Sequence, residues 1–190
     1  MLARFFPAHP RAVVETLAGP YGVIEQMVRS GSADLGFVRL PAEDPAFRVR
    51  PLLRGGTICV MAVDHPLAKR EHIELRHLAR NDLILLGRQR SSRNELEYEL
   101  REAGAPFHCR IEVHSVEAAC ACAAAGLGVA VVPALIAGFF RSERLAMRPF
   151  HPDRLSDYGI VMLPDTMATR AAETFIAIIA QELVAASPGA

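Results

Sequence analysis

The sequence predicts an α/β fold in which strands alternate with helices almost throughout the chain. Short apolar, β-branched runs are separated by stretches in which apolar residues recur at helical spacing, and glycines stand where several of these helices would end. About half of the 190 residues are apolar (51%), which is enough to fill a sizeable core. Such alternation indicates a largely parallel sheet covered by helices on both faces, whereas the spacing alone does not distinguish one sheet from two.

The first third of the chain is predicted to contain one helix among several strands. Gly19 and Pro20 turn the chain after the first strand, apolar residues then recur at helical spacing, and Gly31 supplies a C-terminal stop. We expect the helix over 21–30, with Val23, Ile24, Met27 and Val28 on one face, and strands over 11–18, 34–40, 49–54 and 57–63.

The middle of the chain repeats the alternation and places hydroxyl side chains at two helix starts. Ser92 and Glu95 have the spacing of a capping box, and Ser115 is a good N-cap residue. Gly104 and Gly126 end the two helices that begin there. The elements expected are helices over 75–80, 92–103, 115–125 and 134–140 and strands over 83–86, 110–114 and 128–132.

The C-terminal part is predicted to end in an amphipathic helix. Strands over 145–150 and 159–163 precede a helix that begins at about Thr169, and residues 187–190 are expected to form a frayed tail. The apolar stripe of this helix consists of Ala172, Phe175, Ile176, Ile179 and Leu183.

The charge balance argues against direct binding of duplex DNA. Lysine and arginine together number 21, aspartate and glutamate also number 21, and a domain that holds DNA through its phosphates is usually clearly basic. A single basic face could still be hidden within a neutral total. Pro7, His9 and Pro10 interrupt the N-terminus before an apolar signal region could form, so we expect a cytoplasmic protein.

The spacing of reactive side chains does not indicate a metal site, a cofactor or a catalytic pair. Cys120 and Cys122 lack the two-residue gap of a metal or redox pair, so ordinary thiols are expected, with a redox pair between Cys109 and either of them as the alternative. The seven histidines show no metal-ligand spacing. His65 fits a turn after a strand, and His114 has no obvious nucleophile or carboxylate partner for catalysis.

Four runs of residues, taken in order, resemble the effector-binding domain of LysR-type transcriptional regulators. Their order and spacing extend over residues 4–165. The segment from Arg93 to Gly104, with Ile111 and Cys120 beyond it, is also similar to regulators that sense opines and basic amino acids. The four runs are Gly31-Ser-Ala-Asp34-Leu-Gly-Phe, then Pro51-Leu52 with His65-Pro66-Leu67-Ala68, then Glu74-Leu75-Arg-His-Leu78, and finally Gly126-Leu-Gly-Val-Ala-Val-Val-Pro133.

The resemblance implies two α/β lobes of the type II periplasmic-binding-protein kind, joined by two crossover strands. Lobe I would comprise residues 1–61 and 150–190 and lobe II residues 62–149, with the crossovers near 61–63 and 147–150. It also implies a sensor that holds a small-molecule effector in the cleft between its lobes and pairs as a homodimer, with a tetramer formed by the full-length parent.

The resemblance further implies that DNA is reached only through an N-terminal winged helix-turn-helix domain, which is absent from this sequence. Compared with the family, the chain begins inside the first helix of lobe I, at Leu2, Phe5 and Phe6. We therefore expect the first strand of lobe I and one wall of the usual effector site to be missing.

Candidate effector-binding residues follow from where the strands of lobe II end. Ligands of open α/β sheets bind at the carboxyl ends of strands, where helix starts offer unpaired amides that suit an anion. Three predicted helices begin at such ends, and two arginines add positive charge. The predicted residues are Arg39 and Leu40, where the family's first crossover lines its pocket, together with Ser91, Ser92, Arg93, His114, Ser115 and Pro133.

Each of these residues also has a purely structural interpretation. The serines are good helix caps, and the arginines are residue types that commonly lie on solvated surfaces. Taken as a group, they favour an effector-sensing domain for an anionic or amino-acid-like metabolite. The alternatives are a solute-binding protein of the same fold and an enzyme built on it.

Overall fold

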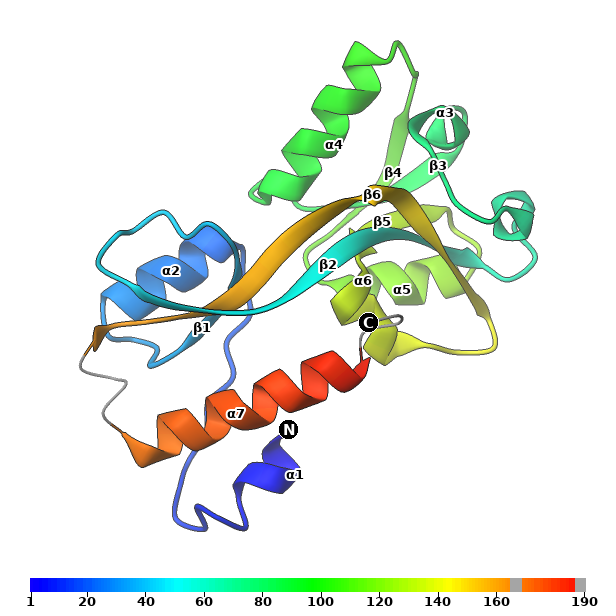
Figure 1. Ribbon diagram of the computed structural model, residues 1–190. Coiled ribbons are helices and arrows are strands. Elements are labelled where there is room, and N and C mark those ends of the chain that lie inside the picture. The colour runs from blue at the N-terminus through cyan, green and yellow to red at the C-terminus, as the bar shows by residue number, and fades with distance from the viewer. Residues whose placement is uncertain (165–168, 187–190) are drawn as a thin grey trace. The chain divides into compact units, whose positions relative to one another are not determined.

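The computed structural model describes residues 1–164 and 169–186, and contacts within the chain divide it into two compact units (Figure 1). The first unit comprises Met1–Arg54 and Ser156–Ala190, and the second comprises Gly55–Leu155. Two long strands, β2 (Arg48–Ala62) and β6 (Leu145–Met162), each contribute residues to both units. The expected frayed tail at 187–190 lies outside the described residues.

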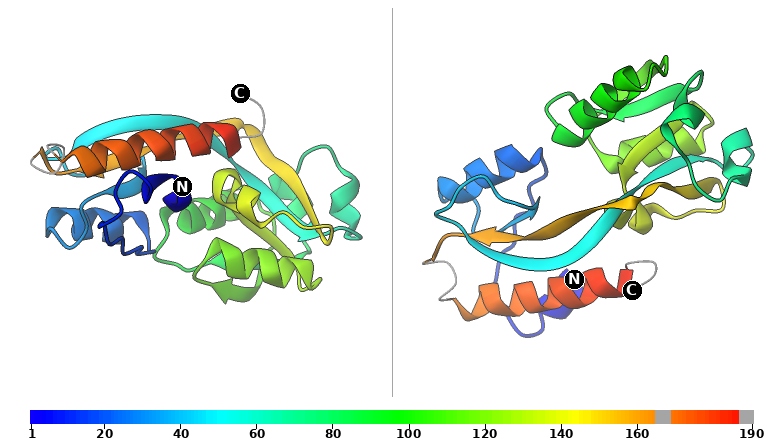
Figure 2. Two further views of the ribbon diagram at one scale, coloured as in Figure 1. Left: turned by 90° about the horizontal axis from the view of Figure 1, so that it is seen from below. Right: turned by 45° about the horizontal axis from the view of Figure 1, so that its top comes forward.

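The first unit is built around a short antiparallel pair of strands. In β1 (Gly36–Arg39), Gly36 pairs with Val161 and Arg39 pairs with Tyr158 of β6. The helix α2 (Tyr21–Arg29) packs so closely on β1 that a Cβ atom at Gly36 would lie 2.8 Å from Ile24 Cγ2. The short α1 (Leu2–Phe5) lies alongside the C-terminal helix α7 (Arg170–Ala186), as Figure 2 also shows, and the rings of Phe5 and Phe175 meet at 5.1 Å.

The second unit contains a three-stranded parallel ladder. Its central strand β3 (Asp82–Leu86) is parallel to both β4 (His108–Val113) and β5 (Val129–Pro133), and β5 is antiparallel to β2. Its helical elements are η1 (Pro66–Lys69), α3 (Leu75–Leu78), α4 (Ser91–Glu102), α5 (Val116–Ala124), α6 (Ala134–Ala137) and η2 (Gly138–Phe140).

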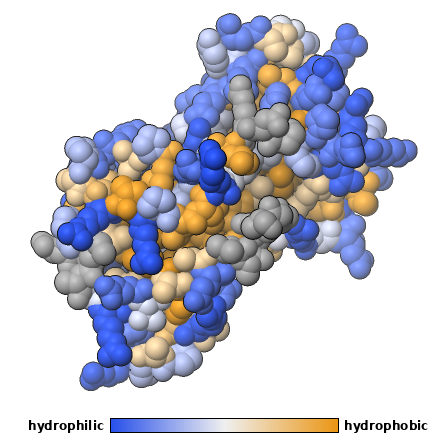
Figure 3. All heavy atoms as spheres, viewed as in Figure 1, coloured by the Kyte–Doolittle hydropathy of each residue, from blue (hydrophilic) through white to orange (hydrophobic). Residues whose placement is uncertain are grey.

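Helices cover both faces of this ladder, as predicted. Leu83 and Leu85 of β3 point to the face covered by α3 and α4, whereas Ile84 and Leu86 point to the face covered by α5 and α6. Every β3 side chain from Leu83 onward is therefore buried, which is typical of a parallel strand between two helical layers. In the view of Figure 3, apolar residues gather along the course of the long strands, and hydrophilic ones predominate over α3 and α4.

The sheet as a whole is mixed, and this corrects the prediction of a largely parallel one. The hydrogen-bonded strand order is β1-β6-β2-β5-β3-β4, in which the β1–β6 and β2–β5 pairs are antiparallel. The sequence predicted four short strands, over 49–54, 57–63, 145–150 and 159–163, where the structure has only β2 and β6. Gly55 and Gly56 resemble a turn in sequence, but glycine also accepts extended backbone, and β2 passes through both of them.

The strand predicted over residues 11–18 is wrong. The segment has no regular secondary structure, and Val13 is 97% exposed. A strand requires a ladder partner as well as β-branched residues, and no described strand pairs with this segment. The other predicted helices and strands are present, with ends that differ by a few residues.

The four cysteines are free, and the redox-pair alternative is wrong for this structure. Cys59 and Cys109 pack with the cluster on the α3–α4 face, whereas Cys120 and Cys122 pack with the cluster on the α5–α6 face. Burial raises the pKa of the Cys59 and Cys120 thiols, which keeps both protonated and unreactive at neutral pH.

Candidate functional site

The carboxyl ends of β3 and β4 lie side by side, because the two strands are parallel and Leu86 pairs with Val113. The next residue of each strand continues this contact. The Gly87 amide donates to the Val113 carbonyl oxygen at 2.9 Å, and a Cβ atom at Gly87 would lie 2.7 Å from His114 Nδ1. Gly87 is therefore required for the imidazole to lie against the end of β3.

Helix α4 begins at this edge without a side-chain cap. Its N-cap residue is Arg90, and no side chain accepts a hydrogen bond from the first turn. The capping box predicted for Ser92 and Glu95 is wrong because the N-cap residue, Arg90, lies two residues before Ser92, which puts Ser91 and Ser92 inside the helix at its first two positions. Within the described parts of the chain, the backbone amides of Ser91 and Ser92 donate to no other group. These two donors are available to a ligand.

Helix α5 begins beside it with its cap in place. Ser115 is the N-cap residue, as predicted, and its Oγ accepts a hydrogen bond from the Ala118 amide at 3.1 Å. The hydroxyl proton of Ser115 can still be donated to another group. Glu117 lies in the first turn of α5, where a carboxylate complements the positive end of the helix dipole.

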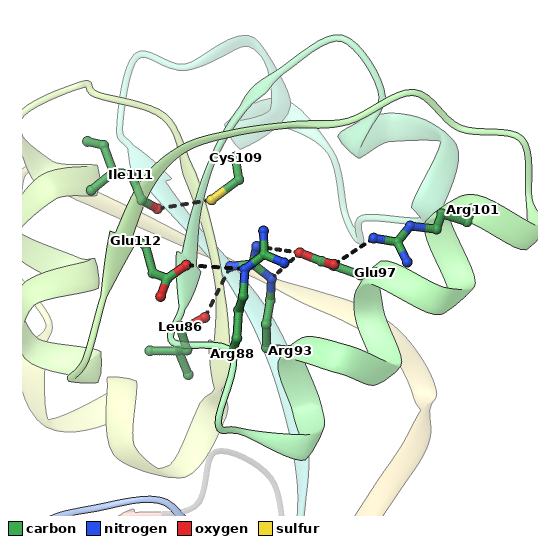
Figure 4. A network of polar contacts seen from close by, with 8 residues as sticks. All are labelled: Leu86, Arg88, Arg93, Glu97, Arg101, Cys109, Ile111 and Glu112. Atoms are coloured by element: carbon green, nitrogen blue, oxygen red, sulfur yellow. Dashed lines mark hydrogen bonds and ion pairs between the residues drawn. The ribbon is translucent and has the colours of Figure 1, made fainter.

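Arg93 points into the protein instead of toward solvent (Figure 4). Its Nε donates to Glu97 Oε1 at 2.7 Å, its Nη1 donates to the Leu86 carbonyl oxygen at 3.1 Å, and its Nη2 also contacts Glu97 Oε1. The second carboxylate oxygen of Glu97 accepts from Arg101 Nη2 at 2.9 Å. All three nitrogens of the Arg93 guanidinium therefore have protein partners.

Two arginines that the sequence analysis did not select lie at the same edge. Arg90 Nη2 donates to the His114 carbonyl oxygen at 3.1 Å, and Arg88 Nε lies 3.9 Å from Glu112 Oε2. Both belong to the segment between β3 and α4, and Arg88 is exposed. The signal that could have found them is the density of arginine in Arg88-Gln-Arg90-Ser-Ser-Arg93, directly after a predicted strand.

The remaining predicted site residues belong to β1, to the residue after it and to β5. Arg39 ends β1 in the first unit, and the Leu40 amide beside it donates to the Asp157 carbonyl oxygen at 2.7 Å. Both side chains are half-buried. Pro133 ends β5 at the carboxyl edge of the second unit and serves as N-cap of α6, which has only four residues. A single turn of helix supplies little dipole, so Pro133 adds little to an anion site.

The described residues contain no group of three or more histidine, cysteine, aspartate or glutamate side chains that could hold a metal ion. His65 caps η1 by accepting from the Leu67 amide at 3.2 Å, in agreement with its interpretation as a turn residue. No helix in the described ranges is both long and apolar enough to cross a membrane.

The family model described as LysR substrate binding domain matches residues 1–184. The chain belongs to this family. The family consists of transcriptional regulators, and the match confirms the resemblance seen in the sequence. The chain is 23% identical over 185 residues to the regulatory protein NocR of Agrobacterium tumefaciens, and 25% identical over 150 residues to the transcriptional activator protein LysR of Escherichia coli. These alignments cover 97% and 79% of the chain but only 62% and 48% of the two relatives.

Solved LysR-family structures share the fold of the domain. The CcmR regulatory domain of Synechocystis PCC6803, in complex with 2-PG, superposes with a TM-score of 0.78 at 19% identity, covering 96% of this chain and 88% of that one. The reduced OxyR regulatory domain from Pseudomonas aeruginosa gives a TM-score of 0.72 at 21% identity, covering 96% and 87%. The predicted fold class, a two-lobed α/β fold of the periplasmic-binding-protein kind, is thereby confirmed.

Within this LysR-type domain, the sequence located the carboxyl edge of β3 and β4 and the helix starts that follow it. The orientation of the side chains at this edge could not be predicted from the sequence. Ser91, Ser92, His114 and Ser115 gather at that edge, whereas Arg93 is turned inward onto Glu97, a residue that the sequence analysis did not select. The limits of the two lobes stay a prediction.

Proposed function

We propose that this effector-binding domain senses a small anionic or amino-acid-like metabolite, with the anionic group held at the start of α4. The observation that carries the proposal is the uncapped first turn of α4, with the amides of Ser91 and Ser92 unpaired within the described residues. Unpaired amides and the positive end of a twelve-residue helix form a natural anion-binding site.

Neighbouring groups at the same edge support this assignment. The Ser115 hydroxyl and the His114 ring lie at the end of the adjacent strand, and Arg88 and Arg90 add positive charge beside them. Glu112 offsets part of that charge, at 3.9 Å from Arg88. The CcmR regulatory domain, which shares the fold, is in complex with 2-PG. Arg39 and Leu40 of the first unit stay predicted ligand contacts.

We further propose that the domain acts within a larger cytoplasmic DNA-binding regulator. The chain spans about three fifths of the length of NocR (62%), so the activity of a whole regulator is a proposal for this chain. The expected assembly is a homodimer, with a tetramer in the full-length protein and DNA contacts made through another domain. Size-exclusion chromatography with light scattering tests the dimer of this chain.

A ligand screen tests the proposed function. Thermal shift is measured with amino acids, opines, aromatic acids, sugar acids and 2-PG, because a ligand that binds only the folded state raises Tm. We expect a stabilising compound that carries a carboxylate or phosphate and is recovered chemically unchanged. Stabilisation only by neutral compounds would contradict the anionic ligand, and turnover of a compound would favour the enzyme alternative.

The matched variants for this screen are Ser91→Pro and Ser91→Ala. Proline at the first helical position removes one amide donor but accepts helical backbone, and Arg90 before it has φ −97° and ψ 126°, which proline tolerates in its predecessor. Ser91→Ala removes only the hydroxyl. We expect Ser91→Pro to weaken binding of the anionic hit more than Ser91→Ala does, and the reverse order would assign the ligand to the hydroxyl instead.

A further inference from the structure

We propose that Arg93 and Glu97 form a buried clamp that positions the segment Gly87–Ser92, so that Arg93 acts as a positioning residue and not as an effector contact. The inference rests on the proposed function of this segment in ligand binding. It assigns to Arg93 a role different from the direct anion contact that its sequence position predicts.

The clamp joins the end of a strand to the first turn of the helix that follows. Arg93 lies at the third position of α4, its side chain is 1% exposed, and it donates to the carbonyl oxygen of Leu86, the last residue of β3. The same guanidinium is held from its other side by Glu97, one turn further along α4. The backbone of Gly87–Ser92 is therefore closed into a loop by one side chain (Figure 4).

Helix stability does not account for arginine at this position. A positive charge in the first turn opposes the helix dipole, and an arginine four residues before a glutamate is the less favourable order of such a pair. A buried ion pair is also often no more stabilising than apolar residues of similar size. An apolar residue, however, cannot donate to the Leu86 carbonyl oxygen. The clamp thus explains a residue choice that breaks the local rules.

Further hydrogen bonds hold the segment Gly87–Ser92 at Gly87 and at Arg90. Gly87 is bonded to the end of β4 through Val113, the Arg90 amide donates to the Gly87 carbonyl oxygen at 3.0 Å, and the Arg90 side chain reaches His114. Together with the clamp, these bonds fix the amides of Ser91 and Ser92 before any ligand arrives. A pre-organised site loses less conformational entropy on binding.

The deciding variant is the double substitution Arg93→Met with Glu97→Met, which removes both buried charges together. Amide hydrogen exchange is measured by NMR at Gly87 and Arg90, whose amides are hydrogen-bonded to Val113 and Gly87, with Leu83–Leu85 of β3 as the internal reference. We expect exchange at Gly87 and Arg90 to become roughly tenfold faster while the reference amides keep their protection, because local opening is separable from global unfolding. Unchanged exchange at these two amides, or an equal change at Leu83–Leu85, would overturn the clamp.

The link to binding is measured with inorganic phosphate, titrated while the amide signals of Ser91 and Ser92 are followed. We expect the double variant to bind phosphate roughly tenfold more weakly than wild type, about the effect of losing one hydrogen bond to a charged group. Unchanged affinity in the double variant would overturn the positioning role. Arg101→Met is the control. Arg101 contacts the same Glu97 carboxylate from the exposed side, so its replacement should change neither the amide exchange nor the phosphate affinity.

The variant Glu97→Gln distinguishes the positioning role of Arg93 from direct contact between Arg93 and the anion. If Arg93 binds the anion itself, weakening its carboxylate partner would leave phosphate affinity unchanged or raise it, which would overturn the clamp. The clamp predicts a lower affinity. If wild type shows no phosphate response at Ser91 or Ser92, the proposed anion site fails, while the exchange experiment on ligand-free protein still decides the clamp.

Discussion

The starts of α4 and α5 lie at the ends of neighbouring parallel strands, yet they are built in opposite ways. At α5, Ser115 caps the helix and Glu117 complements its dipole. At α4, no side chain caps the helix, and a basic residue in the first turn is folded inward onto Glu97. At both starts the first two amides, those of Ser91 and Ser92 in α4 and of Val116 and Glu117 in α5, donate to no group within the described residues. The charge beside them differs, because the carboxylate of Glu117 lies at the α5 start, whereas Arg88 and Arg90 lie beside the α4 start. This difference in charge marks α4 as the helix start better suited to an anionic ligand.

The largest change in stability is expected when the buried Arg93–Glu97 pair at the start of α4 is disrupted. Glu97→Ala leaves the Arg93 charge buried without its carboxylate partner, and we expect a loss of about 3–5 kcal/mol in the free energy of unfolding, measured by urea denaturation. Arg101→Ala removes the exposed arm of the same network and should cost less than about 1 kcal/mol. Equal losses would show that the Arg93–Glu97 pair is not the buried part of the network.

The next largest change is expected in ligand affinity, when one of the unpaired amides of α4 is removed. Ser91→Pro should lower the affinity for an anionic ligand by about 1.5–3 kcal/mol, the usual contribution of a hydrogen bond to a charged group, and leave the unfolding free energy within about 0.5 kcal/mol of wild type. Isothermal titration calorimetry and urea denaturation measure the two quantities. A variant that loses stability without losing affinity would reverse the contrast between the two helices.

A smaller effect is expected from the caps. Ser115→Ala removes the bond to the Ala118 amide and should cost about 1 kcal/mol of stability, whereas Ser92→Ala removes no cap and should stay within about 0.5 kcal/mol of wild type. Thermal or urea denaturation of both variants gives the comparison. A larger loss for Ser92→Ala than for Ser115→Ala would show that α4 is capped after all.

The smallest effect lies at the amino end of β3, opposite the proposed site. Hydrogen bonds from His108 and Arg110 hold the pKa of Asp82 below its ordinary value of 3.8. The ionised Asp82 therefore adds stability above that value, and the contribution is lost as pH falls through the lowered pKa. Asp82→Asn should flatten the acid limb of a stability–pH curve, with a smaller change near pH 7 than Glu97→Ala produces. An unchanged acid limb would contradict the shift.

The sequence predicted the alternating elements of the second unit well, because each of them is specified by local signals. The run Leu83–Leu86, the N-cap at Ser115 and the glycine after α5 all depend on neighbours within a few residues. Long strands such as β2 and β6 were divided in two, since their continuity is decided by partners far away in the chain. The strand predicted over 11–18 was wrong for the same reason: a strand needs a distant pairing partner, and no described strand pairs with this segment.

The candidate site could be located from the sequence but not resolved into roles. The carboxyl ends of β3 and β4 follow from topology, so Ser91, Ser92, His114 and Ser115 were predicted to lie at this edge, where the structure places them. Their contact with a ligand stays a prediction. Whether Arg93 faces outward or inward depends on Glu97 and on the Leu86 carbonyl oxygen, a contact of three-dimensional packing. The charge pattern of α4 alone does not distinguish the two orientations.

A crystal structure with the best-stabilising anionic compound tests the central claim most directly. We predict that an oxygen of its carboxylate or phosphate lies about 2.7–3.2 Å from the amide nitrogen of Ser91 or Ser92, with the Arg93 guanidinium still bonded to Glu97. A ligand held by Arg93 itself, or one whose anionic group makes no contact with the start of α4, would contradict the account.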